Sequence, residues 1–365
     1  MKDFLLLTPG PTKVPDRVLA KCALPMIHHR TKEFQAILER INGNLPKAFA
    51  TKHPVLTFAS SGTGAMDSSI TNLFSKGQVI LSFSAGKWGE RYRDIARSYG
   101  LDVKSFEKKY GEAFTAAEVE AGLKANPNAK GVLMTLCETS TAVVHPIESI
   151  AKVTRGSNAI LMIDAISGLG CDVLKMDEWG VDVVVSGSQK GFMLPPGLAF
   201  VALGERAQAR MAASDLPKFY FHFAETLKMM KKNDTPFTPA VSLMRGLDEA
   251  LSMMLEEGVE AGWKRHARIA DHVRKTMKSL GLEIFAKAPS NAVTAVNMPN
   301  GFPSKDLINF VRDTHHVVLA DGQGELQGKI IRFSHMGATA CDEDAKRGLD
   351  SVADAIKKLG VLNPV

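Results

Sequence analysis

Lys190 closes a stretch whose composition places it at a ligand crevice. Residues 182–190, DVVVSGSQK, run through three valines and then through glycine and small hydroxyl residues before the lysine. In an open α/β sheet, ligands bind beyond the carboxyl ends of the strands, which is where this lysine would lie. An amine held there can bond a carbonyl group and, once released, can act as a general base. We therefore expect Lys190 to serve chemistry rather than to be an ordinary solvated cation.

A second stretch has the features of a phosphate-binding loop. Residues 60–69, SSGTGAMDSS, stand between a strand-like run and a helical pattern, with glycines at 62 and 64. Such glycines let backbone N–H groups approach a ligand, and a helix N-terminus favours an anion. The stretch lacks the GK[ST] of a nucleoside-triphosphate loop and the full GxGxxG dinucleotide pattern, which argues against ATP and NAD. Taken alone, such a loop is more often a plain helix cap.

Asp164 ends the apolar run ILMID at residues 160–164. A carboxylate buried at a strand end is costly unless it meets a positive or proton-donating partner, although it could also simply cap the following helix. Together the acid, the loop and the lysine describe a site for pyridoxal phosphate. Lys190 would form the Schiff base, Asp164 would keep the ring nitrogen protonated so that the ring withdraws electrons, and the loop would bind the 5′-phosphate.

The runs that carry these residues belong to an alternating pattern of strands and helices. Several of the strand-like runs are apolar on both faces, as a buried parallel sheet requires. The helical patterns between them have apolar residues at 3.6-residue spacing, which predicts an α/β domain. The expected strands are VLTFAS, QVILSFS, GVLMTL, AILMIDA, DVVVSGS and LAFVALG, and the expected helices are GAMDSSITNLFS, GERYRDIARSYG and AAEVEAGLKA.

A second, shorter cycle of elements follows a charged helix expected at residues 261–280. Its expected strands are LEIFAKA, AVTAVNMP, HVVLADG and KIIRFSHM, and its helices lie near 304–315 and 342–359. This order predicts a smaller α+β domain. We divide the chain into an N-terminal segment at 1–20, a large cofactor-binding domain at 21–258 and a small C-terminal domain at 259–365.

On these motifs, the chain resembles the class V pyridoxal-phosphate aminotransferases of fold type I, particularly the alanine–glyoxylate and serine–pyruvate aminotransferases. The resemblance runs from LLLTPGPTKVP to beyond KIIRFSHMG. It implies a large domain with a mainly parallel seven-stranded sheet and a homodimer with active sites at the subunit interface. It also implies that an amino group moves from a small amino acid, such as alanine or serine, to a 2-oxo acid such as glyoxylate or pyruvate.

The resemblance assigns roles to residues of three motifs that hold the cofactor. SGSQK matches the family's Schiff-base motif, which implies Lys190 as the cofactor-bound lysine and Gln189 as a phosphate ligand. SGTGAM matches the phosphate loop, with donors from Thr63, Gly64 and Ala65. KWGER places Trp88 where the family stacks an aromatic ring on the cofactor, although a tryptophan that opens a helix is usually part of the core.

Three further motifs complete the implied site. In ETSTA, Ser140 would hydrogen-bond the cofactor's O3′, and Ala142 stands where a glycine is usual. In TPFTPAVSL, Thr238 would reach the partner subunit's phosphate, while Phe237 stands where related chains often have a tyrosine. In IIRFSHMG, Arg332 would bind the substrate α-carboxylate, for which a planar guanidinium is suited.

The stretch MIHHRTKEF at residues 26–34 has two readings. It resembles the entrance region of class V aminotransferases, and the phosphoserine aminotransferases have a similar His-Arg pair there that holds the substrate phosphate. The resemblance therefore implies His29 and Arg30 as candidates for binding the distal end of the substrate. It could equally be a polar turn before a helix. We expect no metal here, because adjacent side chains on an extended segment point to opposite sides and no third ligand is apparent.

The composition bears on the cellular location of the protein and on the class of its ligands. The chain has 365 residues, a net charge of +6 and no apolar run near the 18 residues of a membrane span. Its basic residues are dispersed, which favours small anionic substrates over nucleic acid. Four cysteines without metal-ligand spacing indicate free thiols, and no cleavable leader is visible at the N-terminus, so we expect a cytoplasmic protein.

Other functions on the same fold stay open. A phosphoserine or aspartate aminotransferase is the nearest. A cysteine desulfurase or a lyase is a further alternative, and a desulfurase would need a mobile nucleophilic cysteine, for which Cys341 is the candidate. A non-catalytic subunit is the alternative from a different class, and the presence of Asp164, Lys190 and Arg332 argues against it.

Overall fold

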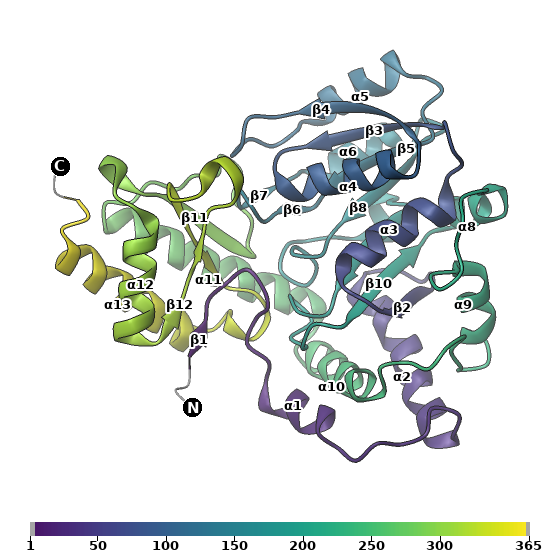
Figure 1. The fold of residues 1–365 in the computed structure, drawn as a ribbon, viewed down its shortest axis with the longest axis horizontal. Helices are drawn as coiled ribbons and strands as arrows, with labels where there is room; N and C mark the ends of the chain where they lie inside the picture. The colour runs from purple at the N-terminus through teal and green to yellow at the C-terminus, as the bar shows by residue number, and fades with distance from the viewer. Residues whose placement is uncertain (1–3, 363–365) are drawn as a thin grey trace.

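The computed structural model describes residues 4–362 and contains two parts that lie side by side (Figure 1). The larger part is a seven-stranded sheet covered by helices, and the smaller part holds the C-terminal elements together with the N-terminal strand β1 (Leu5–Leu6). None of the helices within residues 4–362 combines the length and the apolar character needed to cross a membrane.

The large sheet confirms the predicted, mainly parallel architecture. Its strand order is β2-β10-β9-β8-β5-β3-β4, and only β10 runs against its neighbours. The strands are β2 (Val55–Ala59), β3 (Val79–Ser84), β4 (Asp102–Glu107), β5 (Gly131–Thr135), β8 (Ile160–Asp164), β9 (Val183–Gly187) and β10 (Leu198–Leu203). The sequence analysis missed β4, DVKSFE, because it is a largely polar and exposed edge strand without a buried apolar run.

Side-chain alternation along β8 divides the core into two layers. Ile163 packs in the cluster that includes α2 and α10, whereas Met162 packs with α3 and α4. Asp164 follows in the Met162 register and therefore faces the α3 and α4 side. The helices of this part are α1 (Asp16–Cys22), α2 (Lys32–Ala48), α3 (Gly62–Leu73), α4 (Lys87–Ser98), α5 (Ala116–Ala125), α6 (Ile147–Thr154), α7 (Met176–Trp179), α8 (Glu205–Arg210), α9 (Phe223–Met230) and α10 (Val241–Glu257).

The smaller part is α+β, as predicted. It contains the antiparallel sheet β11-β14-β13 and the parallel pair of β1 and β12. Its elements are α11 (Val259–Ser279), β11 (Val293–Asn297), α12 (Ser304–His315), β12 (Val317–Val318), β13 (Ala320–Asp321), β14 (Ile330–Ser334) and α13 (Asp342–Leu359). Gly258 lies between α10 and α11, and the domain boundary proposed there stays a prediction.

Two of the expected strands in this part were wrong in detail. Residues 282–288 form only an isolated bridge between Ile284 and Val296. Residues 316–322 split into β12 and β13, which pair in different sheets because β12 joins β1 and β13 joins β14. In both segments the strands are set by the distant segments with which they pair, and the local sequence pattern does not show which segments these are.

Candidate active site

A cavity of about 500 Å³ opens at the carboxyl ends of β8 and β9. This is within the usual size range of a cofactor site. It contains six of the predicted site residues, namely Thr63, Trp88, Asp164, Gln189, Lys190 and Arg332. The sequence motifs therefore converge in space as expected.

Lys190 follows β9 by three residues and is nearly buried, with 8% of its surface exposed. Its Nζ donates a hydrogen bond to the backbone carbonyl of Pro9. The neighbouring Gly10 has φ +100°, and a Cβ there would lie 2.6 Å from Nζ, so this close approach requires glycine. Burial lowers the pKa of Lys190 to about 8, and the charge of Arg332 acts in the same direction. The neutral fraction of Lys190 near neutral pH is therefore larger than that of an ordinary lysine.

Asp164 is the last residue of β8 and pairs in register with Val185 of β9. Its Oδ1 accepts a hydrogen bond from the N–H of Ile166 at 2.9 Å, so it does cap the following turn. Burial raises the pKa of Asp164 to about 7, and the hydrogen bond from Ile166 opposes this shift. Because Asp164 also lines the cavity, a proton donor or cation there would favour its ionised form.

The first turn of α3 has backbone N–H groups without a side-chain cap, because Ser61 forms no capping bond. A Cβ on Gly62 would lie 2.6 Å from Ile166 Cδ1, so the backbone packs too tightly for a side chain. Thr63 lines the cavity, whereas Gly64 and Ala65 do not, and Ala65 is fully buried in the core. Any contribution of these two residues would have to come from their backbone.

Trp88 is held by a residue distant in sequence. Its backbone N–H and that of Gly89 donate to Glu138 Oε2 at 3.1 and 3.0 Å. Glu138 is fully buried and supplies the N-terminal cap that Gly86 cannot supply, since Gly86 has no side chain. The indole Nε1 of Trp88 is buried and has no hydrogen-bond partner among residues 4–362, and the same holds for Gln189 Oε1.

Ser140 does not line the cavity. Its Oγ donates to Glu138 Oε1 at 2.5 Å and accepts from the N–H of Lys87 at 3.1 Å. The adjacent Thr139 lines the cavity instead, with its Oγ1 donating to Ser167 at 2.5 Å. The predicted contact of Ser140 with the cofactor therefore has no support in this geometry, because Glu138 already takes the hydroxyl. Ala142, where a glycine is usual, has φ 60°, a conformation that glycine adopts without strain.

Arg332 reaches the cavity from β14 in the smaller part. Its Nε donates to the carbonyl of Asp321 at 2.9 Å and its Nη1 to the carbonyl of Thr139 at 3.1 Å. Burial lowers the pKa of Arg332 to about 10, while Asp321 and Glu138 favour its charge. Within residues 4–362, none of the recorded hydrogen bonds uses Nη2, so this group can serve a ligand.

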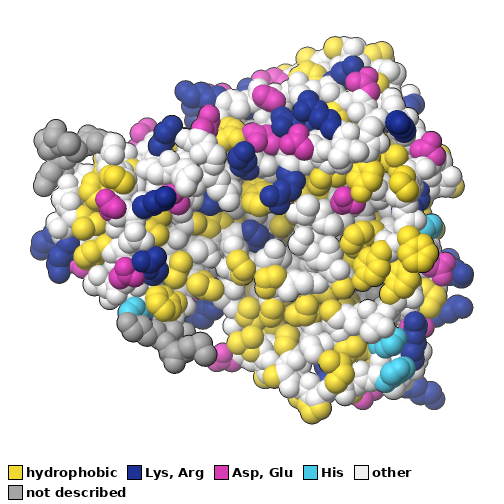
Figure 2. Space-filling view, viewed as in Figure 1, with side chains coloured by type: hydrophobic (Ala, Val, Ile, Leu, Met, Phe, Trp, Pro, Cys, Tyr) yellow, Lys and Arg dark blue, Asp and Glu magenta, His cyan; other side chains and the backbone are white. Residues whose placement is uncertain are grey.

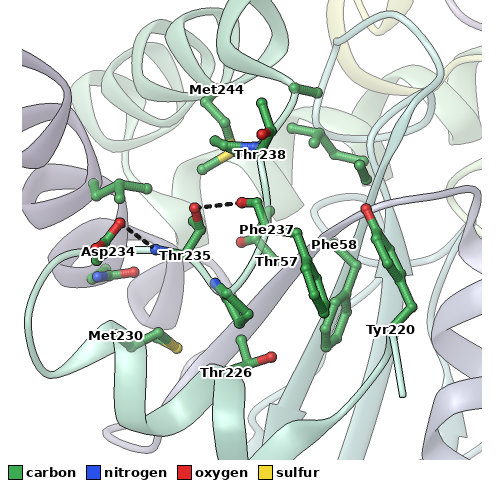
Figure 3. Close-up of a pocket in the computed structure, with 17 residues that line it drawn as sticks. Thr57, Phe58, Tyr220, Thr226, Met230, Asp234, Thr235, Phe237, Thr238 and Met244 are labelled. Carbon is green, nitrogen blue, oxygen red and sulfur yellow. Dashed lines mark hydrogen bonds between the residues drawn. The ribbon is translucent and has the colours of Figure 1, made fainter. Parts of the chain in front are cut away.

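Three predicted residues lie away from this cavity within the chain. Thr238 lines a separate small pocket of about 60 Å³ with Phe237 and Tyr220 (Figure 3). The Phe237 ring stacks on Tyr220 at a centroid distance of 5.0 Å, so a tyrosine hydroxyl does lie near Phe237. Arg30 forms an ion pair with Asp234. His29 lies in a neighbouring groove that Thr238 also lines.

The sequence analysis missed several residues of the cavity. Arg91, Cys137, Gln323 and the segment around Pro9 line it as well. Arg91 could have been found, because it follows Trp88 by one helical turn and therefore shares its helix face. The Pro9 segment and Gln323 come from opposite ends of the chain, and only tertiary contacts reveal them.

The comparison with protein families identifies this arrangement. Residues 4–347 match the model described as aminotransferase class-V. The chain belongs to this family. It is therefore a pyridoxal-phosphate-dependent aminotransferase, in agreement with the cofactor and activity predicted from the motifs.

Individual relatives span nearly the whole chain. It is 36% identical to the soluble hydrogenase, small subunit, of Synechococcus sp., over 98% of this chain and 94% of the relative. It is 33% identical to the L-aspartate–glyoxylate aminotransferase of Paracoccus denitrificans, over 98% and 92% of the two chains. The solved structure of alanine–glyoxylate aminotransferase from Nostoc sp. has a TM-score of 0.94 at 27% identity, covering 98% of this chain and 96% of that one.

The cavity fits the cofactor. The uncapped N–H groups at the start of α3 supply donors for a phosphate, the unpartnered side-chain amide of Gln189 supplies a further polar group, and Asp164 supplies an acceptor for a ring N–H. Lys190 supplies the amine that can bond the aldehyde carbon.

Proposed function

We propose that this aminotransferase moves an amino group from a small amino acid, such as alanine or serine, to a 2-oxo acid such as glyoxylate or pyruvate. Arg332 carries the proposal, because a buried guanidinium in the cavity of Lys190 suits a carboxylate that every amino acid has. Glyoxylate as the acceptor is supported by the names of the Paracoccus and Nostoc relatives.

The residues that the sequence motifs singled out in the cavity have proposed roles. The bound cofactor supplies an electron sink for the bonds at the amino acid's Cα. Lys190 acts first as the general base that removes the proton from Cα and then as the general acid that gives this proton up. Its lowered pKa suits it to both tasks. Asp164 holds the proton of the ring nitrogen, Trp88 covers the ring, and Gln189 with the first turn of α3 binds the phosphate. Arg332 orients the substrate.

We also propose that the enzyme acts as a homodimer with Thr238, His29 and Arg30 facing the partner's site. Figure 2 shows hydrophobic side chains gathered on the face over α9 and α10. Phe219 is 82% exposed and Met26 is 71% exposed, which is costly for a monomer in water. A partner subunit on this face would bury both residues.

The test is a half-reaction screen without an acceptor. Holoenzyme is mixed with single amino acids, and the 2-oxo acid released per site is measured at early times. Alanine or serine should react fastest. A strong preference for phosphoserine would replace the small-substrate assignment.

Aspartate is the second candidate donor, because the Paracoccus relative is named for it. The same screen separates the two donors. A desulfurase is less supported, since Cys341 stands at the N-terminus of α13 and does not line the cavity, and burial raises the pKa of its thiol. Sulfide release from cysteine would restore that possibility. A non-catalytic subunit is the remaining alternative, because the Synechococcus relative is named as a subunit of a soluble hydrogenase. Such a protein would release no 2-oxo acid in the screen.

A further inference from the structure

Arg91 is a cation at the cavity that forms no ion pair with a carboxylate of residues 4–362. It lies on α4, lines the cavity of Lys190 and is exposed. Two other arginines on the same helix do have such partners: Arg93 and Arg97 approach Asp94 at 2.8 and 3.7 Å. Within residues 4–362, Arg91 forms a hydrogen bond and a stacking contact, and neither is with a carboxylate. Its charge also acts on the buried Asp164, where it favours the ionised carboxylate without forming an ion pair.

Both contacts hold the guanidinium beside the first turn of α3. Its Nη1 donates to Thr63 Oγ1 at 3.1 Å, and its central carbon lies 4.3 Å from the centre of the Trp88 ring. Stacking on an aromatic face leaves the edge of a guanidinium, with its N–H groups, available for an anion.

Gln189 approaches the same turn from the end of β9. A Cβ on Gly187 would lie 3.3 Å from Gln189 Oε1 and 3.4 Å from the N of Gly62, so the Gln189 side chain and the start of α3 flank the same point. Gln189 Oε1 is buried without a partner, and an amide placed the other way round would present its N–H groups. A helix N-terminus, an amide and a guanidinium around one space form an anion site.

The other two cations that line the cavity are held by backbone carbonyls and have other proposed roles, Lys190 as the base and Arg332 at the substrate carboxylate. Lys190 contacts the Pro9 carbonyl, and Arg332 is held by the carbonyls of Asp321 and Thr139. We propose that Arg91 binds the 5′-phosphate of the cofactor and supplies the positive charge opposite that phosphate monoester. This inference rests on the placement of the phosphate at the start of α3 under the proposed function.

The experiment uses apoprotein and two ligands that differ only in the phosphate, pyridoxamine 5′-phosphate and pyridoxamine. Neither has an aldehyde, so neither can bond Lys190, and their dissociation constants report non-covalent contacts alone. Both ligands are titrated into wild type, Arg91→Gln and Arg97→Gln. Arg97 is the matched control, because it is a half-exposed arginine on the same helix that does not line the cavity.

We expect Arg91→Gln to raise the dissociation constant of pyridoxamine 5′-phosphate about tenfold or more, the usual effect of losing a charge-assisted hydrogen bond. The constant of pyridoxamine should stay the same, and Arg97→Gln should change neither. If pyridoxamine binds too weakly, the dissociation constant of inorganic phosphate, measured by competition, should rise in Arg91→Gln only.

Three results would overturn the inference. Equal losses for both ligands would show that Arg91 acts through the Trp88 ring. An unchanged affinity for pyridoxamine 5′-phosphate or for inorganic phosphate would show that it does not bind the phosphate, and a KM increase for aspartate alone would then assign it to the substrate. A wild-type apoprotein that binds neither ligand would contradict the proposed function as well.

Discussion

The buried carboxylate of Glu138 accepts the backbone N–H of Trp88 at 3.1 Å, although 50 positions separate the two residues in the chain. This contact fixes the first turn of α4, which brings the Trp88 ring to the cavity. Each oxygen of this carboxylate accepts two donors: the N–H groups of Trp88 and Gly89 on one side, and the N–H and hydroxyl of Ser140 on the other.

Glu138→Gln should destabilise the protein, by about 3 kcal/mol. An amide must turn its NH₂ group toward one pair of donors, which leaves those donors without an acceptor in a buried place. Urea unfolding of the apoprotein measures the loss. The control is Glu148→Gln, an exposed glutamate paired with Lys152 on the surface of α6, for which the change should be within about 0.5 kcal/mol. Equal losses of unfolding free energy in the two variants would show that the buried cap by Glu138 contributes no more to stability than an exposed surface ion pair.

Asp164→Asn should slow the release of 2-oxo acid in a single turnover, even with saturating cofactor, because an amide does not favour a protonated ring nitrogen. The matched control is Asp182→Asn, a buried carboxylate that caps the other end of the sheet by accepting from the N–H of Leu161 at 2.8 Å. That variant should lose stability but keep its single-turnover rate. A normal rate in Asp164→Asn would leave Asp164 as only a turn cap.

The raised pKa of Asp164 should also be visible in the pH dependence of the unfolding free energy. Its folded pKa of about 7 lies above the ordinary value of 3.8, so between these values the folded apoprotein binds more protons than the unfolded chain. The contribution of Asp164 to stability is therefore present below pH 4 and is lost as the pH rises to 7, at a rate of up to about 1.4 kcal/mol per pH unit. The difference in unfolding free energy between Asp164→Asn and wild type should shift in favour of the variant from pH 4 to 7. If this difference does not depend on pH, the pKa of Asp164 is not raised in the folded protein.

Arg332→Ala should impair alanine, serine and acidic donors alike, by roughly 2 to 5 kcal/mol in kcat/KM, because all of them carry an α-carboxylate. Arg30→Ala should leave alanine nearly unchanged and affect only donors with a second anion, such as aspartate or phosphoserine. Since Arg30 also pairs with Asp234, equal harm to all donors in Arg30→Ala would show that this residue is structural.

Local pattern predicted most of the fold. The buried strands β8 and β9 and the helices α5, α12 and α13 lie where apolar runs and periodicity placed them, because burial on one or both faces leaves a direct trace in the sequence. The polar edge strand β4 and the split of β12 from β13 left no such trace. For the site, Lys190 and Asp164 were accessible because strand ends converge in an open sheet. The commitment of Ser140 to Glu138 and the place of Arg91 depend on contacts between distant segments, and the roles of Thr238 and Arg30 involve a second subunit.

The most direct test of the account is to locate the covalent bond between cofactor and protein. Holoenzyme is reduced with borohydride, digested and mapped by mass spectrometry, and Lys190→Ala is treated in the same way and assayed for turnover. The account predicts a pyridoxyl adduct on the peptide that contains Lys190, no adduct in the variant, and no turnover in the variant although its apoprotein still binds the cofactor. An adduct on another lysine, or wild-type turnover in Lys190→Ala, would contradict it.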